Sequence, residues 1–368
     1  MEKSHLNLFE LVNVCVRCGN CLTSCPVYEI QRDEAVSPRG KIYLIKYGLE
    51  GKIKEKGILD VLPYCSLCGG CEFVCPSGIR TIDIIIEARK KWGKNRLKKI
   101  AIDGLTKEIF PAHLFTTILS IISPEKFPFS PSPRPFLSTV NEFIKGKGKG
   151  KVLFFVGCLT NKFFPNIARA ISEIVVKAGY DLYIPKGQVC CGFPYLSIGE
   201  EREFQKMKTH NLKMIKKIEP DLIISPCPTG LNTFRRYYRL DNVIDVSNFV
   251  LKNLEHLKLK NLNWNMTWHD PCHLKKELGI RKEPRKVLSI VGNFVEMERP
   301  DLCCGFGGSF SLSHPEISFK IRNKKKEFVL ESGADYLVTE CPGCIMFLGS
   351  YSPVKTLHLG EIVNRAIR

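Results

Sequence analysis

Apolar and polar residues follow the same order in two successive stretches of this 368-residue chain. Short apolar runs at 152–156 and 222–224 predict strands, because strands buried in a parallel sheet read as continuous apolar segments. The lysine-rich run at 201–218, and its counterpart at 317–332, have the spacing of crossover helices. Alternating strands and helices predict a parallel α/β sheet in each stretch.

The first hundred residues have a different pattern. The run Lys41–Gly48, which follows Pro38-Arg39-Gly40, has apolar residues at the spacing of an amphipathic helix. We therefore expect an N-terminal α-helical domain followed by duplicated α/β domains, with these bounds: 1–100 for the helical domain, 101–150 for a proline-rich connector, 151–262 for the first α/β domain and 263–368 for the second.

The positions of the cysteines show the same duplication. Their offsets are 114, 113 and 114 residues, for Cys158 and Cys272, for the pairs Cys190-Cys191 and Cys303-Cys304, and for Cys227 and Cys341. The sequence Gly-Phe follows both pairs. A repeat of this length indicates a duplicated domain rather than a solenoid.

Eight of the 17 cysteines form two copies of the motif C-x2-C-x2-C-x3-C-P. Three closely spaced thiolates of such a motif hold one iron–sulfur cube, and the fourth cysteine ligates the neighbouring cube. The sequence therefore predicts two [4Fe-4S] cubane clusters with crossed ligands: Cys15, Cys18, Cys21 and Cys75 for the first cubane, and Cys65, Cys68, Cys71 and Cys25 for the second cubane. The helix predicted between the two motifs favours an α-helical ferredoxin-type domain.

Two other uses of these cysteines fit less well. Disulfides are typical of short secreted chains, and no apolar signal segment precedes Cys15. Zinc sites usually pair two C-x2-C units and have no use for a third cysteine at the same step or for a trailing Cys-Pro. We therefore expect clusters and a cytoplasmic location.

The remaining nine cysteines predict thiolate sites in both repeats. Adjacent cysteines are poor disulfide partners, since consecutive Cα atoms lie about 3.8 Å apart and an unstrained disulfide needs roughly 4.4–6.8 Å. The second repeat has five candidate ligands: Cys272, Cys303, Cys304, Cys341 and Cys344. The first repeat has Gly230 in place of the fifth and keeps four: Cys158, Cys190, Cys191 and Cys227. Four thiolates fit zinc, a simpler cluster or a vestigial site, and the sequence leaves these three open.

Two histidines, His269 and His273, flank Cys272. Hydrogen bonds to the sulfurs of a cluster raise its reduction potential. We therefore expect these two imidazoles to hydrogen-bond cluster sulfurs in the second repeat.

Several stretches resemble a known family. His269–Leu274, with Pro284-Arg285 after it, and Cys303–Phe310 resemble glycolate oxidase iron–sulfur subunits, and lactate-utilisation iron–sulfur proteins carry a similar version of the second stretch. Two ferredoxin motifs followed by two cysteine-rich domains are also similar to the catalytic subunits of heterodisulfide reductase. Domains of this kind bind a non-cubane [4Fe-4S] cluster there, so the resemblance implies a third cluster on the five cysteines of the second repeat.

The resemblance implies a function as well. It implies an electron-transfer subunit of a hetero-oligomeric, flavin-dependent 2-hydroxyacid dehydrogenase, with an FAD-binding glycolate or D-lactate dehydrogenase subunit as partner and a quinone or another carrier as acceptor. The sequence contains no nucleotide-binding fingerprint after a strand, so we expect no hydride acceptor of its own. The alternative is a heterodisulfide reductase-type catalytic subunit that cleaves a disulfide at a cluster, and Gly230 counts against it.

The formal net charge of +18 adds little to this picture. The densest basic run, Arg89–Lys99, lacks a nucleic-acid motif and is interpreted as a solvated helix face rather than a dedicated docking surface, so no nucleic-acid partner is expected. No apolar run reaches the roughly 18–20 residues that span a bilayer. The best candidate, Phe110–Ile122, is bracketed by prolines and is expected to pack against a partner or the protein's own core, with interfacial docking as the alternative. Peripheral membrane association through the complex stays open.

Overall fold

The computed structural model describes residues 7–93, 96–106, 131–350 and 354–367. The chain divides into two compact units, and each unit is assembled from three separate segments. Unit 1 consists of Met1–Ile100, Pro194–Glu203 and Leu302–Lys325, and unit 2 of Ala101–Phe193, Phe204–Asp301 and Lys326–Arg368. The domain bounds expected from the sequence stay a prediction.

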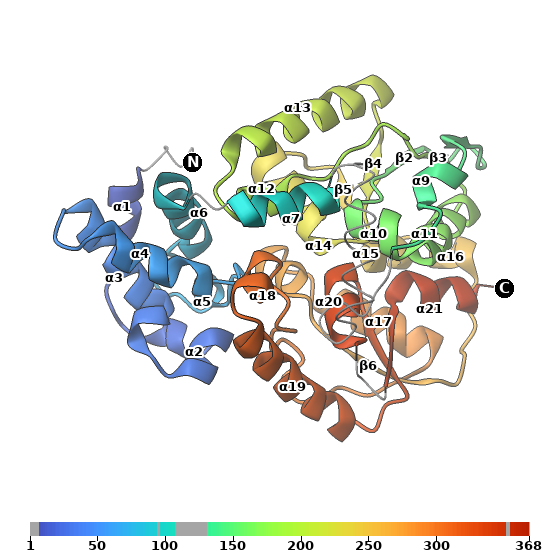
Figure 1. The fold of residues 1–368 in the computed structure, drawn as a ribbon. Coiled ribbons are helices and arrows are strands. Elements are labelled where there is room, and N and C mark those ends of the chain that lie inside the picture. Colours follow the sequence, from blue (N-terminus) through green and yellow to red (C-terminus); the bar gives the residue numbers. More distant parts are fainter. Residues whose placement is uncertain (1–6, 94–95, 107–130, 351–353, 368) are drawn as a thin grey trace. The chain divides into compact units, whose positions relative to one another are not determined.

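Unit 1 is helical throughout its described N-terminal part (Figure 1). Its α-helices are α1 (Leu8–Asn13), α2 (Pro26–Gln31), α3 (Pro38–Leu49), α4 (Glu55–Val61), α5 (Gly70–Phe73), α6 (Thr81–Trp92) and, from the third segment, α18 (Ser309–Ser313). Single 3₁₀ turns connect them: η1 (Asn20–Leu22), η2 (Glu34–Val36) and η3 (Leu62–Tyr64). Helices α7 (Arg96–Thr106), α12 (Phe193–Leu196), α13 (Glu201–Ile218) and α19 (Pro315–Glu331) have residues in both units.

Helix α3 confirms the amphipathic helix predicted between the two motifs. It begins where a helix start is expected, because the Ser37 hydroxyl accepts a hydrogen bond from the Gly40 amide at 2.9 Å and Pro38 occupies the first turn. Its buried face includes Ile42 and Ile45, and the helix contacts α4 and α6. Helix α3 therefore packs on α4, which also lies between the two motifs, and on α6, which follows the second motif.

Unit 2 contains two sheets whose parallel strands follow the same order. The first sheet runs β1-β3-β2-β4-β5 and the second runs β7-β6-β8-β9. Their strands are β1 (Phe143–Ile144), β2 (Lys151–Phe154), β3 (Asp181–Tyr183), β4 (Leu222–Ile224), β5 (Val243–Ile244), β6 (Asn265–Trp268), β7 (Asn293–Phe294), β8 (Tyr336–Thr339) and β9 (Lys355–His358). Without β1, each sheet is a four-stranded parallel sheet, which confirms the predicted duplication and the mixed helix-and-sheet class.

Strand β1 was not expected. It comes from the connector and pairs antiparallel with β3, with Phe143 opposite Tyr183. The two rings lie 5.0 Å apart between centroids, so an aromatic cross-strand pair fixes this edge. A two-residue strand inside a lysine- and glycine-rich stretch has too little apolar periodicity to be seen in the sequence.

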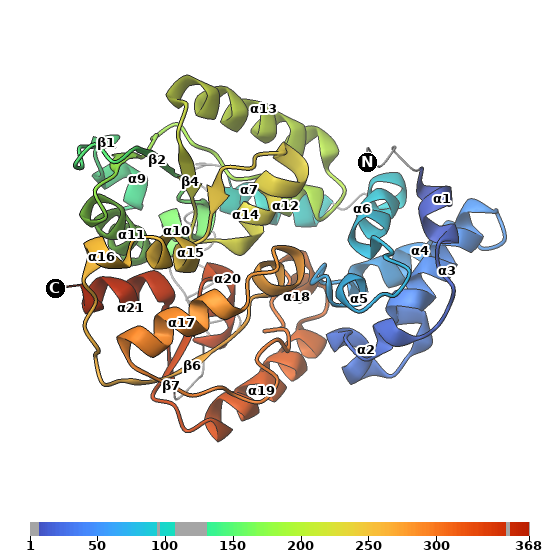
Figure 2. The same ribbon diagram turned by 180° about the vertical axis from the view of Figure 1, so that it is seen from behind.

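The helices of unit 2 cover both sheets. They are α9 (Phe136–Thr139), α10 (Cys158–Phe163), α11 (Pro165–Lys177), α14 (Pro228–Thr233), α15 (Val246–Leu251), α16 (Leu254–Leu257), α17 (Lys282–Val291), α20 (Pro342–Leu348) and α21 (Leu359–Ala366), with π-helical turns at η4 (Phe234–Tyr238) and η5 (His273–Glu277). Helices α11 and α21 lie side by side in both views (Figures 1 and 2), and one continuous core joins the two repeats.

Among the described residues, no helix has the length and the apolar character needed to cross a bilayer. The apolar candidate Phe110–Ile122 lies outside the residues that the structure describes.

Candidate metal centres

The two ferredoxin motifs fold into loops with the same backbone shape. In each loop the residue before the second cysteine and the glycine after it have positive φ, at Arg17 (61°), Gly19 (89°), Leu67 (56°) and Gly69 (72°). Left-handed backbone at a residue with a Cβ costs roughly 1–2 kcal/mol, so these loops adopt a shape that local preference does not favour. Strain of this kind clusters at functional sites.

Cysteines from both motifs line one cavity in unit 1. Cys65, Cys68 and Cys71 of the second motif line it together with Cys25, the last cysteine of the first motif. Burial raises the pKa of the Cys71 thiol well above its usual range and that of Cys25 to about 11. The free thiols of Cys25 and Cys71 therefore favour the neutral form, and a bound cation would favour their thiolates.

Of the remaining motif cysteines, Cys18 is exposed, and Cys15, Cys21 and Cys75 are partly buried. Cys15 and Cys18 lie near Cys21. Cys75 follows α5, which contacts η1 beside Cys21. Burial raises the pKa of the Cys21 thiol, and the nearby Arg39 opposes that rise.

Arg89 fixes the second motif loop, a role that the sequence interpretation missed. Its guanidinium donates to the carbonyl oxygens of Leu62 and Cys65, both at 2.7 Å, and of Ser197 at 2.6 Å. The interpretation of this run as a solvated helix face is wrong for Arg89, which is buried. A buried arginine depends on acceptors far away in sequence, so the run of basic residues contains no signal for it.

In the first repeat, Cys158 and Cys227 follow the ends of strands β2 and β4, and Cys190 and Cys191 form the Cys-Cys-Gly loop. Cys158 begins α10 directly after β2, and its sulfur lies 3.8 Å from that of Cys190. The contact with Cys158, together with Cys191 and burial, raises the pKa of Cys190 well above its usual range. Burial also raises the pKa of Cys227, and the nearby Cys341, Cys191 and Cys158 raise it further. The structure thus brings these four thiols together at the carboxyl ends of adjacent parallel strands.

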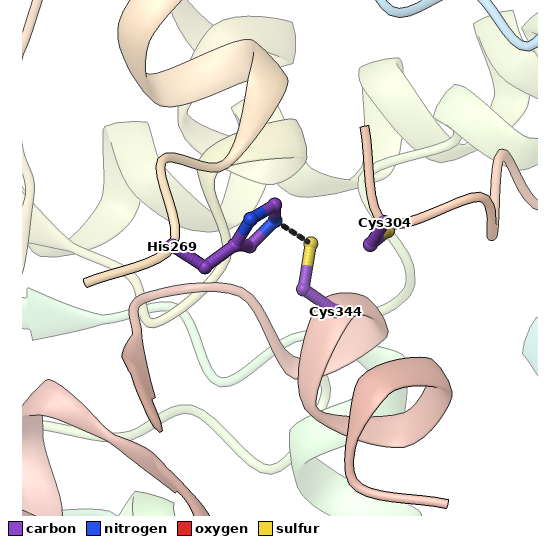
Figure 3. A group of neighbouring side chains, drawn as sticks. All are labelled: His269, Cys304 and Cys344. Carbon is purple, nitrogen blue, oxygen red and sulfur yellow. Dashed lines mark hydrogen bonds between the residues drawn. The ribbon is translucent and has the colours of Figure 1, made fainter. Parts of the chain in front are cut away.

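Unit 2 carries three of the five second-repeat cysteines in matching positions. Cys272 follows β6, and Cys341 caps α20 with φ and ψ of −120° and 112°, nearly those of Cys227 at −119° and 111°. Cys344 lies one turn into α20, where His269 Nε2 is 3.3 Å from its sulfur (Figure 3). The sulfur that His269 contacts is therefore that of a candidate ligand.

His273 joins the two repeats within unit 2. Its Nδ1 lies 2.8 Å from the hydroxyl of Thr229, which belongs to the first repeat. Its ring also meets Phe193 edge to face, at 5.3 Å between centroids. A hydroxyl of the other repeat as the partner of this imidazole was not expected from the sequence.

Asp270 explains why His269 and Cys272 are held on a fixed loop. Its carboxylate accepts hydrogen bonds from Trp268 Nε1 at 2.7 Å and from both terminal nitrogens of Arg285 at 2.9 and 3.0 Å. A bidentate, largely buried arginine–carboxylate pair is among the stronger polar contacts in proteins. Asp270 and Arg285, which belong to the stretches that resemble the known family, therefore hold the loop that carries His269 and Cys272.

Cys303 and Cys304 belong to unit 1, where both are buried. The Gly305 amide donates to the Cys303 sulfur at 3.4 Å, and the Gly305 carbonyl accepts from the Ser318 hydroxyl at 2.7 Å. Cys303 shares an apolar cluster with Val27 and Val36, against which Cys25 and Cys68 also pack.

The two repeats differ at two linked positions. The second has His269 and Cys344 in hydrogen-bond contact, whereas the first has Phe155 and Gly230 at the equivalent places. Phe155 is fully buried and packs edge to face on Phe234, 4.6 Å between centroids. The fifth thiol and the imidazole beside it are therefore both replaced in the first repeat.

Comparisons with known proteins agree with this organisation. The cysteine-rich domain family matches residues 152–235 and 266–349, and the 4Fe-4S dicluster domain family matches residues 11–79. A subunit of the CoM/CoB fumarate reductase of Methanothermobacter marburgensis is 28% identical over 96% of this chain and 72% of its own length. The probable glycolate oxidase iron–sulfur subunit of Bacillus subtilis is 29% identical over 99% of this chain and 96% of its own.

Lactate utilization protein A of Bacillus subtilis is 30% identical over 58% of this chain, a match that covers 99% of that protein. The chain therefore belongs to the family of iron–sulfur proteins that join a 4Fe-4S dicluster domain to two cysteine-rich domains, a family that includes iron–sulfur subunits of glycolate oxidase and of heterodisulfide reductase.

Proposed function

We propose that this chain is the electron-transfer subunit of a flavin-dependent 2-hydroxyacid dehydrogenase. It takes electrons from an FAD-binding glycolate or D-lactate dehydrogenase subunit and passes them to a quinone or another carrier. The observation that carries the proposal is the gathering of buried thiols in successive sites, one of them the cavity lined by Cys25, Cys65, Cys68 and Cys71. The names of relatives from Bacillus subtilis and Escherichia coli support the substrate class.

The residues present fit iron–sulfur clusters. When bound, such clusters supply one-electron transfer at potentials that ligands, hydrogen bonds and burial adjust. The chain supplies buried thiols whose raised pKa values favour the neutral form, so the positive irons are needed to hold them as thiolates. The amide of Gly305 and the imidazole of His269 supply hydrogen bonds to ligand sulfurs.

Each centre takes its own set of ligands in this proposal. Cys65, Cys68, Cys71 and Cys25 hold the second cubane, which their common cavity supports, and Cys15, Cys18, Cys21 and Cys75 hold the first. The third [4Fe-4S] cluster takes Cys272, Cys303, Cys304, Cys341 and Cys344. In the first repeat, the contact of Cys158 with Cys190 supports a four-thiolate metal centre, either zinc or a cluster.

A catalytic disulfide reductase is the second candidate, favoured by relatives whose names make them subunits of heterodisulfide reductase. Such a function calls for a pair of intact cysteine-rich sites. The replacement of the His269–Cys344 pair by Phe155 and Gly230 in the first repeat counts against it.

Addition of the partner tests the proposed function. The chain alone should not oxidise glycolate or D-lactate. With a purified FAD-binding dehydrogenase subunit from the same organism, either substrate should bleach the cluster absorbance, because reduced flavin then has an acceptor. Stopped-flow absorbance follows flavin and clusters separately. Clusters that dithionite reduces but the partner does not would overturn the proposal, and consumption of a disulfide by the reduced chain alone would favour the second candidate.

Metal analysis tests the ligand assignment. Three clusters of four irons predict about twelve irons per chain in anaerobically prepared protein. Cys344→Ser should lower the content toward about eight and change the paramagnetic resonance spectrum of one centre only. A wild-type content near eight would contradict the third cluster, and a content near sixteen would assign another cluster to the first repeat.

A further inference from the structure

The loop that follows Cys303 and Cys304 packs directly on the second ferredoxin motif, and both lie in unit 1. Gly307 has φ of +53°, and a Cβ added there would lie 2.7 Å from the Ser66 Cβ and 3.2 Å from the Ser66 Cα. Ser66 lies between Cys65 and Cys68. The absence of a side chain at Gly307 therefore lets the backbone of one thiolate loop touch the backbone of the other.

Two further contacts hold the loops together. The rings of Tyr64 and His314 stack with centroids 3.7 Å apart and an angle of 28° between planes. Tyr64 directly precedes Cys65. His314 directly follows α18, in the segment that contains Cys303 and Cys304. In addition, Cys303 and Phe310 share an apolar cluster against which Tyr64, Cys25 and Cys68 pack.

These contacts bear on the rate of electron exchange. Tunnelling between two centres falls exponentially with the distance between them and depends on the packed atoms that lie between. At this junction, Cys68 packs against the apolar cluster that contains Cys303, and the lack of a side chain at Gly307 lets the two loops lie in contact at Ser66.

We propose that Gly307 is a positioning residue that sets the separation between the second cubane and the centre on Cys303 and Cys304, and that electrons pass between them across this contact. One electron leaves one centre and arrives at the other, and no bond or proton changes. The ultimate reductant is the reduced flavin of the partner, so the inference rests on the proposed function.

A matched pair of glycines tests the inference. Gly308 has nearly the same φ as Gly307, +55°, but nothing lies within 4 Å of a Cβ added there. Both substitutions place a side chain on backbone with positive φ, with ψ of −106° at Gly308, but only Gly307→Ala also brings a Cβ against the other loop. Both should keep the wild-type iron content.

The readouts are the magnetic coupling between the two centres in the fully reduced protein and the rate of electron exchange between them. Gly307→Ala should weaken the coupling and slow the exchange several-fold, whereas Gly308→Ala should match the wild type. Adding Ser66→Gly to Gly307→Ala removes the nearest clashing atom and should restore part of both. Unchanged coupling and rate in an iron-replete Gly307→Ala protein would overturn the inference.

If Gly307→Ala loses iron, a second variant still tests the inference. His314→Leu removes the stack on Tyr64 without adding an atom at the Gly307 contact, and it should also weaken the coupling. Failure of the proposed function would appear differently, as clusters that exchange electrons with each other but accept none from the flavoprotein.

Discussion

Replacing Cys68 by Ser should stop electron delivery through the chain while the partner's flavin is still reduced by substrate. Cys68 lines the cavity of the second cubane and packs against the cluster of apolar residues that contains Cys303. A hydroxyl is a poor ligand for iron and keeps its proton, so the variant loses or alters this centre and leaves the others.

Stopped-flow absorbance of the complex measures both steps, with flavin reduction expected at the wild-type rate and acceptor reduction at a small fraction of it. Asn20→Ala is the matched control, because Asn20 lies in a motif loop, is exposed and has no thiol. Acceptor reduction at the wild-type rate by the Cys68→Ser complex would make the second cubane a structural bystander.

Replacing Arg89 by Ala should destabilise unit 1 and release the second cubane. The change leaves the carbonyl oxygens of Cys65 and Ser197 without their donor, and that of Leu62 with only the Cys65 amide, at 3.4 Å. Each buried acceptor left unsatisfied costs about 1–3 kcal/mol, so the free energy of unfolding should fall by roughly 4 kcal/mol. Iron content should fall as well, because the Cys65 backbone loses its anchor.

Anaerobic denaturant titration and iron analysis measure these two effects. Arg80→Ala is the control, since Arg80 is exposed and pairs with Asp83 at 2.7 Å, and its loss should cost less than about 1 kcal/mol. Arg89→Lys keeps the charge but cannot reach three acceptors at once, so an intermediate effect is expected. An Arg89→Ala protein as stable as Arg80→Ala would show that the three hydrogen bonds are dispensable.

Much of the fold could be predicted because its signals are local. The apolar runs that became β2 and β4, and the amphipathic helix α13, are each readable from a few neighbouring residues. The repeat spacing of Cys158 and Cys272 added the duplication, which the equal strand orders of the two sheets confirm.

What could not be predicted depends on contacts between distant segments. Arg89 meets acceptors 24 to 108 residues away, and Gly307 meets Ser66 across most of the chain. Neither has a periodic pattern. The exchange of His269 for Phe155 is visible only after the two repeats are aligned, and the contact of His269 with Cys344 is known only from the fold.

The assembly of unit 1 from three segments has a consequence during synthesis. Helices α1 to α6 are complete once about a quarter of the chain has been made, but their apolar cluster includes Phe310, Ile317 and Ile321 from Leu302–Lys325. At about 5–20 residues per second, the ribosome needs roughly 10–45 s more to deliver that segment. The nascent N-terminal helices therefore keep an open apolar face during this time, so cluster insertion into the second cubane site should be largely post-translational, and a chain truncated before Leu302 should be prone to aggregation.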